Sequence, residues 1–199
     1  DETGNKVFFQ AGDMKFVDRD GNHCIDDADR VIIGDPNPDI YGNIFTHFNW
    51  KRWTLDATFT YSLGNDIFNY ERSILESGKY FYNQTTAMNS RWTTEGQVTS
   101  MPRISYKDPH GNSRFSDRWI EDGSYLRLKT LNLSYKVPVN SEWLQGLTIW
   151  AEASNLFTLT HYLGSDPEFS ASNSVLYQGI DPGNIALSRA FTFGLKINL

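Results

Sequence analysis

The sequence ends in a stretch where apolar side chains occupy every second position. These residues are Phe191, Phe193, Leu195, Ile197 and Leu199. The residues between them are polar or glycine, and a period of two is typical of a β-strand with one apolar and one polar face. A strand of about 9–11 residues with this pattern can cross a bilayer as part of a barrel. The same pattern also fits a half-buried strand of a soluble sandwich, so the rest of the chain must decide.

An earlier stretch, 53–61, alternates in the same way and carries Asp56, Thr58 and Thr60 on its polar face. A face of threonine and aspartate suits a water-facing lumen and not the dry core of a sandwich. Three further stretches have strand-like patterns, namely 41–50, 125–137 and 147–159. With an irregular apolar stretch over 6–17, the sequence therefore predicts an all-β chain of about six antiparallel strands.

Composition excludes several classes of protein. The 199 residues contain no run of about 18 apolar residues, so a transmembrane helix is excluded. An aromatic content of 15% fits the girdles that barrels place at both membrane interfaces. The single Cys24 cannot form an internal disulfide. A net charge of −6, without a cluster of lysine and arginine, argues against a nucleic-acid partner.

The lengths of the connections between the expected strands alternate. The stretches 18–38, 64–117 and 160–189 are long, whereas Lys51-Arg52 and 138–145 are short. Outer-membrane barrels have short periplasmic turns and long extracellular loops, while loops above about 15 residues are uncommon in soluble domains. We therefore expect a periplasmic C-terminus and extracellular long loops. The tryptophans near the short turns then belong to an interfacial girdle, and they are Trp50, Trp53 and Trp143.

Six strands are too few for a closed transmembrane barrel, which needs about eight. An open sheet would leave two unpaired edges in lipid, where unsatisfied backbone groups are very costly. We therefore expect residues 1–199 to form the C-terminal part of a larger barrel, with the plug domain and early strands outside this sequence.

Six sequence blocks occur in an order and at a spacing that together are specific, although each block alone is weak. They are residues 12–22, 64–69, 91–93, 116–131, 155–158 and 166–168. In these blocks nearly the whole chain resembles the C-terminal third of the SusC/RagA-like family of TonB-dependent outer-membrane transporters. The resemblance implies a plugged barrel of about 22 strands in the outer membrane of a Gram-negative bacterium. Its lumen-facing residues, such as Lys196 and Asn198, would then line the lumen or touch the plug.

The same resemblance implies the function and the partners. A SusD-like surface lipoprotein caps the extracellular mouth, and the pair imports glycans or peptides too large for porins. A TonB coupling protein supplies energy through an N-terminal region that this sequence does not contain. The resemblance implies a nutrient importer and no enzyme.

Residues 18–29 have the spacing of a calcium-binding loop. Side-chain oxygens stand at positions 1, 3, 5, 9 and 12, and position 7 offers a backbone carbonyl. The six residues of this candidate site are Asp18, Asp20, Asn22, Cys24, Asp26 and Asp29. Two departures are His23 at the position of the turn glycine and the shorter Asp29 in place of a bidentate glutamate. The alternative is an Asx-rich turn without metal, and we expect Ca²⁺ to stabilise the loop.

Other chemistry-bearing residues predict no catalytic site. The four histidines are not at metal-ligand spacing, and no nucleophile elbow or phosphate loop occurs. Glu121 and Asp122 are neighbours on a strand and point to opposite faces, so they form no glycosidase pair; we expect an electrostatic role beside Arg118 and Arg127. Five loop aromatics could stack on sugars or pack on the cap, although mutual packing is favoured; they are Tyr80, Phe81, Tyr82, Trp92 and Tyr106.

Two other classes of protein compete with the importer. One is a soluble or surface-attached β-sandwich that binds carbohydrate through its loop aromatics. The other is a passive porin or adhesin barrel, which would lack the energy-coupling region. The sandwich makes the opposite prediction for Phe191, Phe193 and Leu195, because it places them in a protein core, whereas a barrel places them against lipid.

Overall fold

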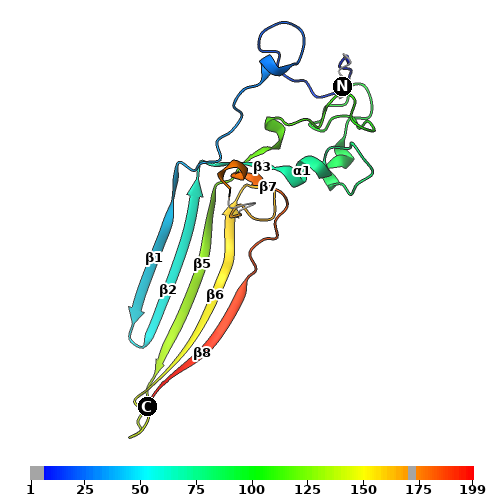
Figure 1. Cartoon of the computed structure of the whole chain (residues 1–199). Coiled ribbons are helices and arrows are strands. Elements are labelled where there is room, and N and C mark those ends of the chain that lie inside the picture. The colour runs from blue at the N-terminus through cyan, green and yellow to red at the C-terminus, as the bar shows by residue number, and fades with distance from the viewer. Residues whose placement is uncertain (1–6, 170–173) are drawn as a thin grey trace.

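The computed structural model describes residues 7–169 and 174–199, and its largest element is one antiparallel sheet (Figure 1). The five strands of this sheet follow the order β1-β2-β5-β6-β8. Their bounds are Ile40–Trp50 for β1, Trp53–Leu63 for β2, Tyr125–Val137 for β5, Gly146–Thr160 for β6 and Ala190–Asn198 for β8. Every neighbouring pair is antiparallel. These strands confirm the predictions for 41–50, 53–61, 125–137 and 147–159 and for the C-terminal stretch.

The connections separate onto the two ends of the sheet, as Figure 1 shows. Lys51-Arg52, in which Lys51 has a left-handed φ of 57°, joins β1 to β2, and residues 138–145 join β5 to β6 at the same end. The long connections and the N-terminal segment lie at the opposite end, while the C-terminus lies beside the short turns. The alternation expected from the sequence is confirmed.

The predicted strand over 6–17 is wrong for the part that the structure describes, since residues 7–17 contain no strand and Lys6 lies outside the described residues. This segment is instead anchored to the long 64–117 connection. The Arg103 amide donates to the Gly12 carbonyl at 2.8 Å, and the Met14 amide donates to Asn112 Oδ1 at 2.9 Å. These bonds hold the segment without a strand ladder, so the main sheet has five strands and not six.

A second, three-stranded sheet of order β4-β3-β7 lies at the long-loop end of the main sheet (Figure 1). It comprises β3 (Asp66–Asn69), β4 (Ile120–Asp122) and β7 (Ile180–Asp181), and α1 (Tyr70–Leu75) follows β3. The described residues also form four 3₁₀ turns, namely η1 (Asp27–Asp29), η2 (Thr86–Ser90), η3 (Asp117–Trp119) and η4 (Val175–Tyr177). No helix within the described residues has the length and hydropathy needed to cross a membrane.

The main sheet is a single layer with almost no core. The chain exposes 13995 Å², whereas a compact protein of its 22.8 kDa mass would expose about 9,600 Å². Ala57 and Leu128 are the buried apolar residues of the main sheet within the described parts, and the other buried apolar side chains lie at the loop end. A sandwich needs a second sheet packed about 10 Å from the first. The structure therefore contradicts the sandwich alternative.

Candidate functional site

The pairing register aligns side chains in rows that run across all five strands of the main sheet. One apolar row consists of Phe48, Leu55, Leu133, Ala151 and Phe193. The next row is polar and consists of His47, Asp56, Asn132, Glu152 and Thr192. Adjacent rows point to opposite faces, so the sheet has an apolar face and a polar face, as the alternation predicts.

The polar face carries its own hydrogen-bond network. His47 Nδ1 lies 2.5 Å from Asp56 Oδ1, and Asn49 Nδ2 lies 2.6 Å from His47 Nε2. Thr54 Oγ1 donates to Asn49 Oδ1 at 2.6 Å. Both ring nitrogens of His47 thus have a hydrogen-bond partner. This face suits contact with water or with a polar protein surface.

A β-bulge in β5 keeps Arg127 on the polar face of the sheet. The register shifts between Leu128 and Thr130, so that Leu128 lies opposite Phe59 on the apolar face. Arg127 then lies opposite Thr60 on β2 and Thr158 on β6. Bulges commonly re-aim a side chain in this way, and here the result is a cation at the loop end of the polar face.

Arg127 anchors the long 160–189 connection to the sheet. Its guanidinium, only 2% exposed, pairs with Asp166 and lies 3.4 Å from Glu168 Oε2. Lys129 Nζ lies 2.9 Å from Glu168 Oε1. Burial alone would raise the pKa of Asp166, but hydrogen bonds from Arg127 and from the Leu187 and Glu168 amides lower it below its ordinary value. Asp166 therefore stays ionised as the centre of this anchor.

Glu121 has an electrostatic role, although not with the residues that its position in the sequence suggested. It pairs with Arg72 of α1, whose Nε lies 2.6 Å from Glu121 Oε1, whereas Arg127 pairs with Asp166. Arg118 stacks instead on the buried Trp119 ring, 4.5 Å from its centroid. Partners separated by 39 to 49 residues leave no local sequence pattern, which is why sequence reasoning missed both pairs.

A second buried contact joins the loops at the small sheet. Tyr162 donates its hydroxyl to Asp181 Oδ2 at 2.6 Å, and Asp181 Oδ1 accepts from the Gly183 amide at 2.9 Å. Burial and the neighbouring carboxylate raise the pKa of Tyr162, so it remains a neutral donor. Asp122, the neighbour of Glu121, accepts from the Ser124 amide at 2.8 Å, and the bonds from Ser124 lower its pKa. These carboxylates thus serve as structural acceptors.

Four of the five loop aromatics pack on one another. Ring centroids of Tyr80 and Tyr82 lie 5.5 Å apart, and those of Phe81 and Tyr106 lie 5.6 Å apart. Tyr80 and Tyr106 meet edge to face at 6.3 Å. Trp92 is separate and covers Gly12, where an added Cβ would stand 2.4 Å from the indole. Mutual packing, the favoured expectation, is what the geometry shows, although Phe81 remains 95% exposed.

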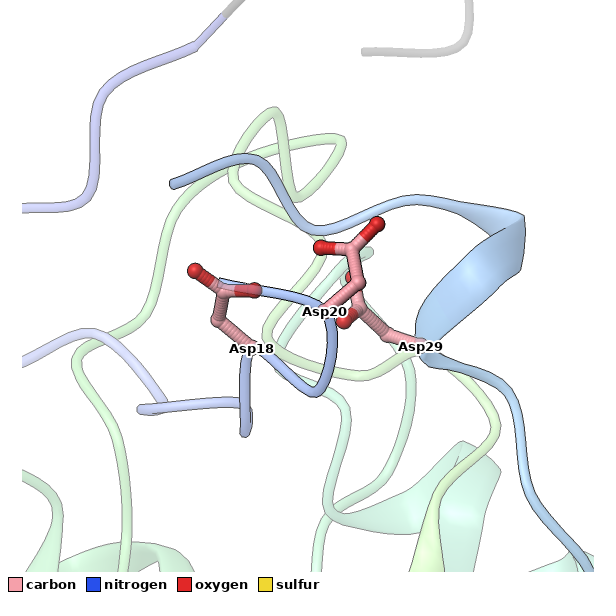
Figure 2. A group of neighbouring side chains, drawn as sticks. All are labelled: Asp18, Asp20 and Asp29. Carbon is pink, nitrogen blue, oxygen red and sulfur yellow. The ribbon is translucent and has the colours of Figure 1, made fainter. Parts of the chain in front are cut away.

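The candidate calcium loop brings three of its six predicted residues together. Asp18, Asp20 and Asp29 each offer a carboxylate oxygen, and these oxygens lie within 4.8 Å of one another (Figure 2). Carboxylates at that separation repel unless a cation lies among them. The His23 amide, and then the Gly21 amide, donate to Asp18 and lower its pKa, which keeps it anionic.

His23 occupies the position of the turn glycine and adopts its backbone conformation, with φ at 62°. The loop therefore keeps the sharp turn at the expense of strain in a non-glycine residue. Asp26 lies outside the converging group and caps η1, accepting from the Ala28 amide at 2.8 Å, although Asp29 in the group also accepts backbone amides, from Arg19 at 2.6 Å and from Asp26 at 2.9 Å. Position 9 often reaches Ca²⁺ through a water, so the three converging carboxylates still form a fitting all-oxygen set.

The remaining residues of the loop are used within the turn. Asn22 Oδ1 accepts from the Cys24 amide at 2.7 Å, and the Cys24 thiol is free and exposed.

At the opposite end of the molecule, the Trp53 and Tyr135 rings lie 4.6 Å apart and Lys51 Nζ lies 4.9 Å over Trp50. An aromatic and cationic group at the short turns has the composition of an interfacial girdle.

Comparison with known proteins gives consistent matches in both sequence and structure, although no protein-family model matches the sequence. TonB-dependent receptor P3 of Formosa agariphila is 34% identical over 94% of this chain and 19% of its own length. TonB-dependent receptor SusC of Bacteroides thetaiotaomicron is 24% identical over 99% of this chain and 18% of its own. The chain thus spans about a fifth of the curated relatives that it matches.

Solved structures of the RagAB peptide importer match the described fold. The open-open state superposes with a TM-score of 0.70 at 26% identity, over 82% of this chain and 17% of that one. The closed-closed state gives a TM-score of 0.71 at 26% identity, over 83% and 18%. The matched proteins are receptors and transporters and not enzymes.

Proposed function

We propose that this chain, whose sequence and fold are those of a segment of the SusC/RagA-like TonB-dependent receptors, forms part of the barrel wall of an outer-membrane nutrient importer. One observation carries the proposal: a single-layered sheet exposes an apolar face, and nothing in the described chain packs on it. Lipid covers such a face at the least cost. The open edges of β1 and β8 then pair with further strands of the complete barrel.

The division between the two ends of the sheet supports the orientation. The long connections and the small sheet face the cell exterior, and the short turns face the periplasm. In this orientation the loops form part of the substrate chamber and the seat of a SusD-like lipoprotein. A TonB coupling protein acts through a plug domain that these 199 residues do not include. The substrate class we propose is glycans or peptides, since one solved neighbour is a peptide importer.

Uptake by the full-length protein tests this function. Deletion of its gene should abolish uptake of the nutrient, and so should loss of TonB in a strain that keeps the gene. Uptake that persists without TonB would instead indicate the passive porin. Expression of residues 1–199 alone as a monodisperse soluble protein that binds carbohydrate would establish the sandwich module and refute the barrel.

We also propose that Asp18, Asp20 and Asp29 bind Ca²⁺, which supplies structural cross-linking of the loop and no chemistry. The support is the convergence of three carboxylates on a loop of the right spacing. Calcium should raise the melting temperature of the full-length protein, and Asp20→Asn should weaken that response. Asp27→Asn, which changes an exposed carboxylate outside the group, is the matched control. An equal response in both variants would show that the loop is an Asx-rich turn without metal.

A further inference from the structure

The apolar face of the main sheet is not flat, because β6 presents small residues between bulky neighbours. Ala151 lies between Leu133 of β5 and Phe193 of β8, and Ala153 lies between Leu131 and Phe191 in the next row of the same face. Two consecutive alanines flanked on both sides make a groove along the strand. A hollow of about 410 Å³ lies at the Ala151 end of this groove, and its lining includes Leu133, Ala151 and Phe193 but not Ala153.

The groove ends near the short turns at a group of larger side chains. Tyr135, Ile149 and Leu195 form the next row of the apolar face, and all three line the hollow. Trp53, whose ring lies 4.6 Å from that of Tyr135, completes this end. Tryptophan and tyrosine prefer the headgroup level of a bilayer. The groove therefore runs from the headgroup level towards the middle of the hydrocarbon.

The turn beside this aromatic end is cationic. Lys51 and Arg52 directly precede Trp53, and both are exposed. The Lys136 amide donates to the Arg52 carbonyl at 2.9 Å, which fixes the turn against β5, while the Lys136 side chain belongs to the opposite, polar face. The nearby 138–145 connection contains one acidic residue, Glu142. Basic side chains at a membrane surface attract anionic headgroups, so this end complements a phosphate.

We propose that the groove is a binding site for one phospholipid of the periplasmic leaflet. An acyl chain lies over Ala151 and Ala153 between the leucines of β5 and the phenylalanines of β8. The phosphate lies at Lys51 and Arg52. A partner strand does not compete for this site, because strands add at the edges β1 and β8 and not on the face of the sheet. The proposal rests on the membrane-spanning role but goes beyond it, since a uniformly apolar face would contact membrane lipids without retaining one lipid at a defined position.

The test uses the full-length barrel, extracted from outer membranes in mild detergent and analysed by native mass spectrometry. Ala151→Leu together with Ala153→Leu fills the groove and should lower the retained phospholipid about tenfold, the effect of about 1.4 kcal/mol. Thr46→Leu is the matched control, because Thr46 lies in the same transverse row as Ala153 but three strands away. It places a leucine at the depth of Ala153 but outside the groove, and should leave retention unchanged.

A second arm tests the phosphate end. Lys51→Gln with Arg52→Gln should abolish a preference for added phosphatidylglycerol over phosphatidylethanolamine, while the chain-binding groove stays intact. The heat-dependent gel shift of a folded barrel is recorded for every variant. If the double variant does not fold, Ala151→Leu and Ala153→Leu are tested singly. A wild-type protein that gives no shift refutes the membrane-spanning role itself. Folded groove variants that retain lipid like the wild type, or a Thr46→Leu that loses as much, overturn the lipid site alone.

Discussion

Removal of Asp166 should release the 160–189 connection from the sheet. Asp166→Ala removes the nearer of the two carboxylates from Arg127, whose side chain is 2% exposed, and breaking a buried pair by removing one partner costs about 3–5 kcal/mol. The contact of Arg127 with Glu168 at 3.4 Å survives, which places the cost near the lower limit. About 3 kcal/mol corresponds to an opening equilibrium raised roughly a hundredfold.

Hydrogen exchange of the full-length protein measures this opening directly. The Leu187 and Glu168 amides donate to Asp166 at 3.0 and 2.9 Å, so both should lose protection along with the loop. The pKa of Asp166 is lowered in the folded state, so its stabilisation is present above the ordinary pKa of the carboxyl and lost only as pH falls through the lowered value. Exchange at neutral pH therefore measures the full effect.

A matched control separates burial from charge. Arg30 and Asp27 form the same kind of pair at 2.9 Å, but their side chains are 81% and 87% exposed. Asp27→Ala should change local exchange by less than about 1 kcal/mol, because water screens the pair. If Asp166→Ala lowered protection of residues 160–189 no more than Asp27→Ala lowers that of its own loop, the anchoring role would be refuted.

Three further outcomes are expected. The left-handed conformation of His23 costs about 1 kcal/mol, and His23→Gly removes this cost. Ca²⁺ binding, measured by calorimetry, should then tighten about fivefold. Weaker binding would contradict the proposed turn. Phe193→Arg, on a side chain 77% exposed, should cost about 2–4 kcal/mol near the membrane midplane and reduce the heat-shifted folded band, whereas Lys196→Gln on the polar face should not. Asp13 is buried, but hydrogen bonds led by Arg103 lower its pKa; a carboxyl NMR titration should therefore place its midpoint below 3.8, and the contact should be lost only below that pH.

The main strands could be predicted from the sequence because their pattern reflects two different environments. Every residue of 53–61 faces either an apolar or a polar medium, so the period of two is clean, and the structure extends the strand only to Leu63. The bulge near Leu128 was beyond such reasoning. It inserts one residue into the pattern, and only the register with β2 shows that the leucines on both sides of it share a face.

The loop end could not be predicted because its elements are held by distant partners. β7 has two residues and pairs with β3, so that Phe68 lies opposite Ile180 across more than a hundred positions. α1 has six residues, too few for a helical period to appear in the sequence. In the calcium loop the spacing selected six residues, and the structure brings together the carboxylates of three of them, Asp18, Asp20 and Asp29, while Asp26 caps η1. Spacing identifies the residues that could act as ligands, but not which of their carboxylates the folded loop brings together.

The two ends of the chain are stabilised by different means, and this has a consequence for how such a protein can vary. Ile67 and Trp119, both almost fully buried, lie in or beside the small sheet, and Met88 and Met101 are buried within the 64–117 connection. The loop end thus has its own packed interior, joined to the wall through Arg127. The main sheet, which is the proposed barrel wall, has almost no packed interior, so its stability in the proposed barrel depends on lipid and on neighbouring strands. In the proposed importer, substitutions within the loops would therefore alter what the extracellular chamber binds without altering the alternation of the strands.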